Sequence, residues 1–416
     1  MKIRYSYFTA FPLFLLLIFP EFSLQTSLAV EKKGCHSIYL CKTYLGLGVA
    51  DWIIIIMAII LMFYTFLNYG RLYINKSSTF YKVTLVSTVY LIIGALYNVF
   101  VHYDLTAYLY DFKLFLYFAV TYYWLKIFCK FEFSSKHIIF IFLIMAIGYL
   151  WDYFYVQNYG RSERPDLLSF MPNILPLINI NFTLLLLVCF KKHRFWLSFF
   201  LIFEILSIFN NASLGSIYLL IASIVFLFIY HLRFKKNMLF IIIFFSWLFI
   251  YFAFPLIMYE VLPLITDLKS DGLQLRKIKT LNALHNYFIN IPVFIGKGLG
   301  ATYFEIFTSE YTNVYSTGVN HIEGNVKFIM HTPLASFYKF GIIGVVIMMF
   351  ILIKTSVKLS KMPEFKNDNV AKFISICYPT FIIAVLITPG ILTNSILAAI
   401  FIFISDQKFL KLLKNT

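Results

Sequence analysis

Long uninterrupted apolar runs recur along most of this chain and constrain its fold more than any other feature. A run of about 18 or more apolar residues is long enough to cross a bilayer as a helix. Because the backbone in lipid must satisfy its own hydrogen bonds, and these runs do not alternate apolar with polar residues, the sequence predicts an all-α, polytopic transmembrane helix bundle. About twelve spans are expected, at 7–24, 49–68, 80–101, 105–128, 137–156, 173–190, 195–210, 212–230, 238–258, 334–353, 371–389 and 391–406.

The basic residues gather in alternate loops between these runs. The chain has 35 Lys and Arg against 19 Asp and Glu, a net charge of +16, although only 13% of its residues are charged. With the N-terminus placed in the cytoplasm, nearly every inner loop is basic, as the positive-inside rule requires. The charge therefore predicts topology and contact with anionic membrane lipids rather than nucleic acid. Both termini are expected on the cytoplasmic side of the membrane.

The N-terminal region leaves two questions open. Residues 1–29 fit a retained first span or a cleaved signal peptide, with Ser27-Leu28-Ala29 as the cleavage site. Cys35 and Cys41 share the first outer loop, where they would form a disulfide or remain two free thiols.

The chain is expected to form a single membrane domain over 1–416, interrupted by one large polar loop. That loop covers 259–333 and is predicted to lie on the outer side of the membrane, and the second-largest outer loop covers 157–172. Neither an internal repeat nor a soluble domain is evident. A large polar loop on a multi-span protein is where chemistry on a membrane-bound substrate is expected.

Segment 271–290 of the large loop has near-helical apolar spacing, with Arg276 and Lys279 on the other side. It is expected to be an amphipathic helix lying over the membrane surface. Arg276 offers a fixed, always-charged fork that binds two phosphate oxygens at once. The alternative for this residue is an arginine that extends to the interface without binding substrate.

Two further features of the loop are candidates for binding and catalysis. The run of Gly296, Lys297, Gly298 and Gly300 could present consecutive backbone N–H groups and an ammonium to a phosphate. A flexible turn would account for the same run. His331 stands at the outer end of a span, where a neutral imidazole could take a proton from a sugar hydroxyl; the alternative is an interfacial histidine bound to backbone.

Small and charged residues within the spans indicate contacts between helices. Gly341 and Gly344 lie inside span 334–353, where small residues usually allow close helix packing. Asp111 and Lys113 lie near the middle of span 105–128, so we expect them to line a cavity or to pair with other helices. No Cys–His spacing is typical of a zinc site and no metal-binding carboxylate pair is evident, so neither a metal nor a cofactor is expected.

Four of these landmarks occur in a characteristic order: Arg276, the run Gly296–Gly300, His331-Thr332 and Gly341–Gly344. In this order the chain resembles the O-antigen polymerase and O-antigen ligase superfamily, polytopic bacterial enzymes that transfer lipid-diphosphate-linked glycans. The resemblance covers about 195–355. It implies an Arg on a helix of the periplasmic loop, then a Gly-x-Gly stretch, and a His before a span that contains Gly-x-x-Gly.

The chain departs from the family pattern in two places. Thr332 follows the histidine where ligases prefer Asn, Ser or Gln, and the outer turn Ser213-Leu214-Gly215 lacks an arginine that many members carry. Arg161 or Arg164 of the loop 157–172 is then the candidate for that cation. These departures favour the polymerase branch over the ligase branch.

The resemblance implies a metal-independent polymerase that joins undecaprenyl-diphosphate-linked oligosaccharide repeat units into O-antigen or capsular polysaccharide. His331 and Arg276 are the expected catalytic residues. The residues expected to bind the diphosphate or the glycan are Arg161, Arg164, Lys279, Gly296, Lys297, Gly298 and Gly300. A chain-length regulator and a flippase of the same pathway are implied partners. The alternatives are an O-antigen ligase that uses lipid A–core as acceptor, a lipid-linked oligosaccharide flippase or other transporter, and a non-catalytic membrane scaffold.

Overall fold

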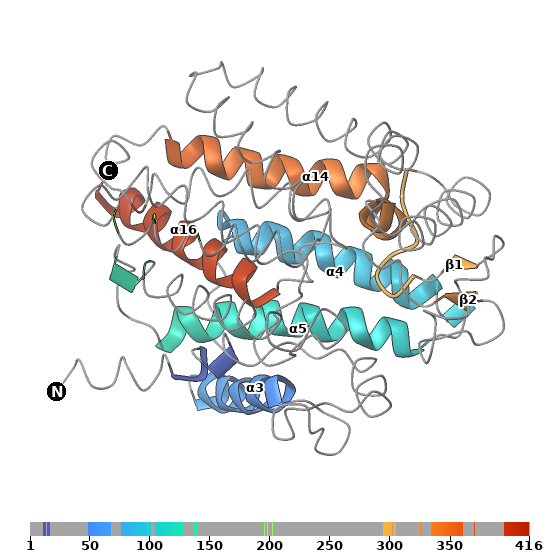
Figure 1. Cartoon of the computed structure of the whole chain (residues 1–416), viewed down its shortest axis with the longest axis horizontal. Helices are drawn as coiled ribbons and strands as arrows, with labels where there is room; N and C mark the ends of the chain where they lie inside the picture. The colour runs from blue at the N-terminus through green and yellow to red at the C-terminus, as the bar shows by residue number, and fades with distance from the viewer. Residues whose placement is uncertain are drawn as a thin grey trace.

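The described part of the chain is a group of long helices packed mostly side by side (Figure 1). The computed structural model describes residues 11–13, 15–16, 49–67, 76–97, 99–100, 105–128, 136–137, 139, 195, 198, 202, 294–301, 303–304, 325–326, 334–360, 370 and 395–415. The helices are α3 (Val49–Leu67), α4 (Thr79–Tyr97), α5 (Leu105–Phe128), α14 (Leu334–Ser360) and α16 (Ser395–Asn415). The remaining elements are the two-residue strands β1 (Tyr303–Phe304) and β2 (Asn325–Val326).

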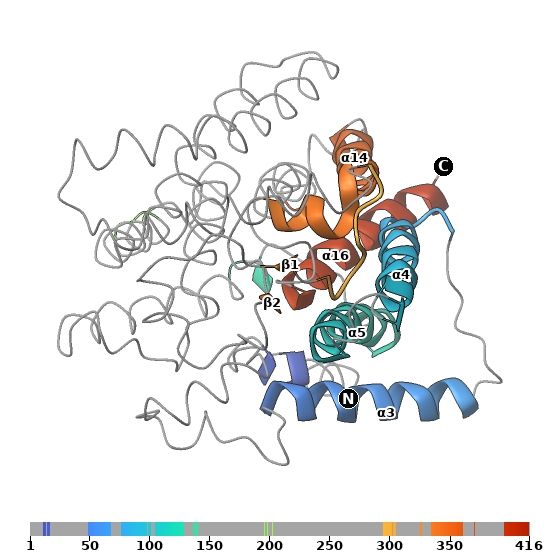
Figure 2. The same cartoon turned by 90° about the vertical axis from the view of Figure 1, so that its right-hand side faces the viewer.

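The strands pair with each other, and the helices pack through α4 and α5. Strand β1 runs antiparallel to β2, with Tyr303 opposite Val326 and Phe304 opposite Asn325. Helix α5 packs against α3, α4 and α16, and α4 also packs against α14 and α16. Helix α3 runs across the others: it is seen nearly end-on in Figure 1 and along its length in Figure 2. The first and last thirds of the chain therefore meet in one helical layer.

Three described helices are long and apolar enough to cross a membrane, over Ala50–Leu67, Thr79–Tyr97 and Tyr338–Thr355. They coincide with the predicted spans 49–68, 80–101 and 334–353, which confirms helices of membrane length there. Helix α5 has the bounds predicted for span 105–128, but it is not among the three. The other predicted spans lie mostly or wholly outside the described residues.

Two helices continue past the expected membrane boundary. Helix α14 runs to Ser360, so Lys354 and Lys358 lie on its last turns rather than in a loop. Helix α16, described over Ser395–Asn415, continues past 406 and includes the basic segment 408–414. Both helices extend past the expected spans because apolarity marks what lies in lipid, whereas a helix ends only where its terminal carbonyls find other partners.

The N-terminus of α4 is capped from two directions. Ser78 precedes the helix, and its Oγ accepts the Tyr81 N–H at 3.1 Å, as an N-cap serine does. The Asp406 carboxylate of α16 accepts the N–H groups of Thr79 at 2.8 Å and Phe80 at 3.1 Å. These are N–H groups that a helix cannot satisfy within itself. The cap thus joins α16 to the start of α4.

An aromatic core closes the space between α4, α5 and α16. The Phe80 ring stacks on Tyr122 with centroids 3.7 Å apart and on Phe118 at 5.2 Å. The Tyr122 hydroxyl donates to Asp406 at 2.9 Å, and its ring meets Phe403 edge-on at 5.8 Å. Because these rings pack tightly around the Asp406 cap, this end of the layer positions α4 firmly, and α4 in turn supports the candidate site at its other end.

Candidate functional site

The glycine run of the large loop is buried between α4, α5 and α14. Residues 296–301 are all buried, and their backbone lies against the three helices. Four consecutive N–H groups of the run donate to other parts of the protein: Lys297 N to Tyr338 O, Gly298 N to Lys339 O and Leu299 N to Tyr90 O, each at 2.9 Å, and Gly300 N to Asp111 Oδ2 at 2.5 Å.

These four hydrogen bonds correct one prediction from the sequence. The run was expected to present its N–H groups to a phosphate, and that expectation is wrong because protein acceptors occupy all four. A run of glycines does allow a nest of N–H groups that binds an anion. It also allows close backbone packing, and here the second property is used.

The run contacts α4 well before the C-terminal end of that helix. Leu299 hydrogen-bonds Tyr90, which precedes the helix end at Tyr97 by about 10 Å at 1.5 Å per residue. Part of the loop predicted to lie outside the membrane therefore re-enters the helix layer. Irregular backbone at that depth is tolerated where it is buried in protein, as it is here.

A break in α14 provides the acceptors for the run. Gly341 has φ 60 and ψ 179, so the helical hydrogen-bond pattern is interrupted there. The carbonyls of Tyr338 and Lys339, just before the break, accept from the run, and Ile343 just after it donates to Phe294 O at 3.1 Å. The loop thus supplies the backbone hydrogen bonds that the broken helix lacks.

The contact leaves no room for a side chain on either backbone. Gly298 has φ 85, and a Cβ on it would lie 2.2 Å from the backbone nitrogen of Gly94. A Cβ on Gly94 would lie 1.9 Å from the carbonyl oxygen of Leu299. Gly344 is similarly close to the Tyr90 ring, which confirms the expected close helix packing at this glycine. Gly341 instead lies against the backbone of residues 294–296.

Lys297 is enclosed by two tyrosines. Its side chain is buried, and its Nζ donates to the Tyr338 hydroxyl at 2.6 Å. The same ammonium lies 5.2 Å from the Tyr97 ring centroid and 4.7 Å from that of Tyr338, within cation–π range. Burial lowers the pKa of Lys297 to about 8. In this arrangement Lys297 fixes the run to α4 and α14 and does not face solvent, where a diphosphate would bind.

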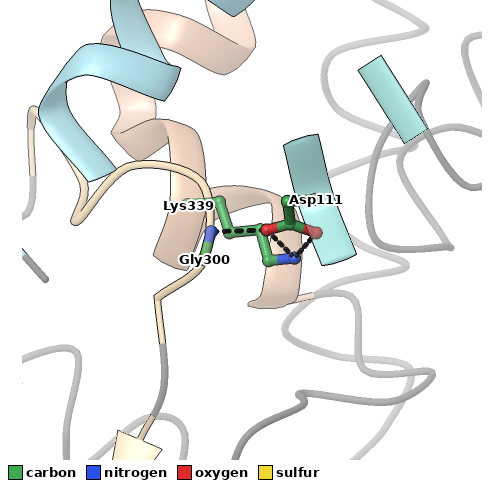
Figure 3. Close-up of polar contacts among 3 residues, drawn as sticks. All are labelled: Asp111, Gly300 and Lys339. Atoms are coloured by element: carbon green, nitrogen blue, oxygen red, sulfur yellow. Dashed lines mark hydrogen bonds and ion pairs between the residues drawn. The ribbon is translucent and has the colours of Figure 1, made fainter. Parts of the chain in front are cut away.

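A buried ion pair joins the end of the run to two helices (Figure 3). The Lys339 ammonium of α14 contacts both oxygens of Asp111 on α5, at 2.8 and 2.7 Å. Asp111 also accepts the N–H of Gly300, so one carboxylate holds α5, α14 and the run together. Both side chains are at least nine-tenths buried, where charges are stable only when paired and hydrogen-bonded.

A second ion pair lies beside the first on α5. Lys113 pairs with Asp51 of α3 at 2.6 Å, and the Tyr117 hydroxyl also donates to Asp51. Asp111 and Lys113 were expected to line a cavity or to pair with other helices. The structure confirms pairing for both, to different helices, and the two pairs set how α5 sits between α3 and α14.

The expected catalytic residues lie outside the described residues. These are His331 and Arg276, together with the proposed binding residues Arg161, Arg164 and Lys279. The amphipathic segment 271–290, the loop 157–172 and the cysteines at 35 and 41 are also outside them. In sequence, His331 lies three positions before Leu334, the first residue of α14. Among the described residues, no three His, Cys, Asp or Glu side chains are grouped as they would be to hold a metal.

Sequence analysis missed several residues that build this site. They are Tyr90, Gly94, Tyr97, Tyr338 and Lys339. Lys339 carried a signal, because a lysine inside a membrane-length apolar segment is expensive unless it is paired. Gly94, near the end of another such segment, was the counterpart of the glycine run, but only the fold could have matched the two.

Searches against protein-family models, curated proteins and solved structures found no match for this chain.

Proposed function

We propose that this chain is a polymerase that joins undecaprenyl-diphosphate-linked oligosaccharide repeat units at the outer face of the bacterial inner membrane. The proposal starts from the order of four sequence landmarks, Arg276, Gly296–Gly300, His331-Thr332 and Gly341–Gly344. It requires the large loop to be held in a defined position over the membrane. Three membrane-length helices among the described residues agree with a membrane location.

One observation carries the proposal. Two of the four landmarks, chosen from the sequence for separate reasons, interlock: the glycine run fills the break at Gly341 through backbone hydrogen bonds. The run is thereby fixed to the start of the helix that His331 precedes by three positions. Two sequence landmarks that pack into one structural unit are better explained by a functional site than by chance spacing.

In the proposed reaction, an acceptor sugar hydroxyl attacks the anomeric carbon of a glycan carried on undecaprenyl diphosphate. The new carbon–oxygen bond forms as the bond to the diphosphate oxygen breaks. His331 takes the hydroxyl proton as general base. Arg276 stabilises the charge that the departing diphosphate gains, in a place where water is partly excluded. Lys279 and Arg161 or Arg164 are proposed to complete the anion site.

The glycine run has a supporting role in this proposal. Its N–H groups and Lys297 are engaged within the protein, so we assign Gly296, Lys297, Gly298 and Gly300 to holding the loop. Substrate contact is left to residues elsewhere in the loop. Direct displacement would invert the anomeric centre, and the departures at Thr332 and at 213–215 favour a polymerase over a ligase.

Transport is the second candidate, and one observation favours it. Ion pairs buried between long apolar helices, such as Asp51–Lys113 and Asp111–Lys339, often mark substrate or ion pathways in transporters. In both pairs the carboxylate accepts a further hydrogen bond, Asp51 from Tyr117 and Asp111 from Gly300. A flippase also has no need for a large polar loop fixed to a broken helix.

The test is the glycan ladder of a strain that lacks the chain, compared with its parent and with complemented strains. Loss of the ladder, with at most one repeat unit on lipid A–core, supports a polymerase. Long polymer that stays on the undecaprenyl carrier means a ligase. An unchanged ladder rejects both enzymes and favours transport or scaffolding.

Complementing variants test the assigned residues. We expect His331→Ala and Arg276→Ala to abolish polymer while the amount of protein in the membrane stays unchanged. His321→Ala, which changes another histidine of the same loop outside the landmark order, is the matched control and should restore the ladder. Full-length polymer from either test variant removes that residue from the proposed site.

A further inference from the structure

Three exposed lysines gather at the end of the α4–α14 pair opposite the glycine run. They are Lys82 in the first turn of α4 and Lys354 and Lys358 near the end of α14. The two helices are joined at this level by a hydrogen bond of 3.0 Å between Thr79 Oγ1 and Thr355 Oγ1. We call Lys82, Lys354 and Lys358 the lysine cluster.

The lysines are close enough to affect one another. Partial burial, and then the positive charges of Lys82 and Lys354, lower the pKa of Lys358. Asp406 caps the neighbouring start of α4, but it is buried and its oxygens accept from Thr79, Phe80 and Tyr122. An anion placed among the three ammonium groups would therefore relieve their mutual repulsion.

Apolar stripes run from the lysine cluster along both helices. On α4 the exposed residues after Lys82 follow helical spacing, and they are Leu85, Val89, Ile92 and Leu96. On α14 the exposed residues leading to Lys354 are Ile343, Ile347 and Phe350. The Lys354 ammonium lies 5.5 Å from the Phe350 ring centroid, so charge and apolar surface are continuous there.

The lengths of these stripes fit a lipid. From Lys82 to Leu96 the helix rises about 21 Å at 1.5 Å per residue, more than the roughly 15 Å of hydrocarbon in one leaflet. An acyl chain can therefore lie against exposed apolar side chains over its whole length while its phosphate stays at the lysines. A soluble anion would use the charges but make no contact with the apolar stripes that adjoin them.

We propose that the lysine cluster and its two apolar stripes form a binding site for one anionic phospholipid, with the headgroup phosphate at Lys82, Lys354 and Lys358. The site is separate from the glycine run and does not depend on the proposed polymerase activity. It differs from the general layer of lipid around any membrane protein in its preference for a negative headgroup. Each lysine near the membrane surface is expected to contribute roughly fivefold in affinity.

The test uses the full chain purified in a mild detergent. Phosphatidylglycerol and phosphatidylcholine with the same acyl chains are added separately, and bound lipid is counted by native mass spectrometry while the apparent Tm is followed. We expect phosphatidylglycerol to be retained and to raise the Tm more than phosphatidylcholine does. Equal retention of the two lipids would overturn the proposal.

Variants separate a built site from general charge. K82Q/K354Q/K358Q should lose the preference by at least about tenfold. K408Q/K411Q/K414Q, which removes three lysines from the end of α16, is the matched control and should keep it. Equal loss in both variants would mean that only total charge matters, contrary to the proposal.

Two further measurements cover the remaining outcomes. If the triple variant does not fold, the single variants K82Q and K354Q are compared with K136Q, which changes another exposed lysine. Loss of the preference for phosphatidylglycerol in both cluster variants, but not in K136Q, supports the site. An equal preference in all three variants overturns it. Glycerol phosphate added alone tests the apolar stripes. If it raises the Tm as much as the whole lipid, the ligand is a free anion and the lipid proposal fails.

Discussion

Replacing Lys339 by methionine would leave the Asp111 carboxylate buried without its cation. The pair is bidentate, with Lys339 Nζ 2.8 and 2.7 Å from the two carboxylate oxygens, and both side chains are more than nine-tenths buried. Removing one partner of such a pair costs about 3–5 kcal/mol, because the remaining charge has lost its compensation. Asp111 would keep only the N–H of Gly300, which offsets about 1–3 kcal/mol at most.

The double variant D111N/K339M should restore most of this stability. The asparagine side-chain oxygen can still accept from Gly300, and no charge is left in the interior. Replacing a buried pair by neutral groups of similar volume is often close to neutral, so the double variant should lie within about 1–2 kcal/mol of the parent. The two substitutions are therefore expected to be strongly non-additive, with K339M alone less stable than the double variant.

The assay is thermal unfolding of the full chain in detergent, followed by the folded fraction that survives heating. At roughly 2 °C per kcal/mol for a chain of this size, K339M should lower the apparent Tm by about 6–10 °C. K113M is the control, and it should have a smaller effect because the Asp51–Lys113 pair is more exposed. A double variant as unstable as K339M alone would refute the reasoning, since the loss would then not come from a stranded charge.

Three further predictions follow from the same contacts. Gly298→Ala should lower stability by about 2–5 kcal/mol, from left-handed backbone strain and a Cβ 2.2 Å from other backbone, whereas Leu85→Ala on the exposed face should change the Tm little in detergent. Because burial lowers the pKa of Lys297 to about 8, charging this side chain opposes folding below pH 8; parental stability relative to K297M should therefore rise between about pH 8 and pH 10.5, and parallel pH profiles would contradict this. Asp406→Ala should cost about 2–3 kcal/mol of stability through the lost cap of α4. The stability of Asp406→Asn should lie between those of the parent and of Asp406→Ala, and an equal Tm for the two variants would argue against the cap.

The sequence predicted the helices of the described part well and their ends less well. Long apolar runs determine which segments can lie in lipid, so α3, α4 and α5 begin and end close to the predicted positions. The C-terminal ends of α14 and α16 lie beyond the predicted spans because both helices continue through polar residues. Hydropathy changes at the membrane surface, but the backbone can remain helical beyond it.

Less of the candidate site than of the fold could be predicted from the sequence. Asp111 was recognised as a residue that needs a partner, because a charge within an apolar span demands one. Its partner Lys339, and the contact between Gly94 and Gly298, could not be found from one sequence. Glycine spacing gives no sign of whether freed N–H groups will face a ligand or another backbone, and the break at Gly341 that decides the matter depends on tertiary packing.

The pairing of Asp111 with Lys339 also sets an order for assembly at the ribosome. Lys339 follows Asp111 by 228 positions, and at 5–20 residues per second its synthesis comes roughly 10–50 s later. For most of that interval α4 and α5 are already made, while neither the glycine run nor the lysine that contacts them has been synthesised. The early helices therefore have to wait with an unmatched carboxylate and an open groove at Gly94, so a chain stopped before residue 294 would be a natural target for membrane quality-control proteases.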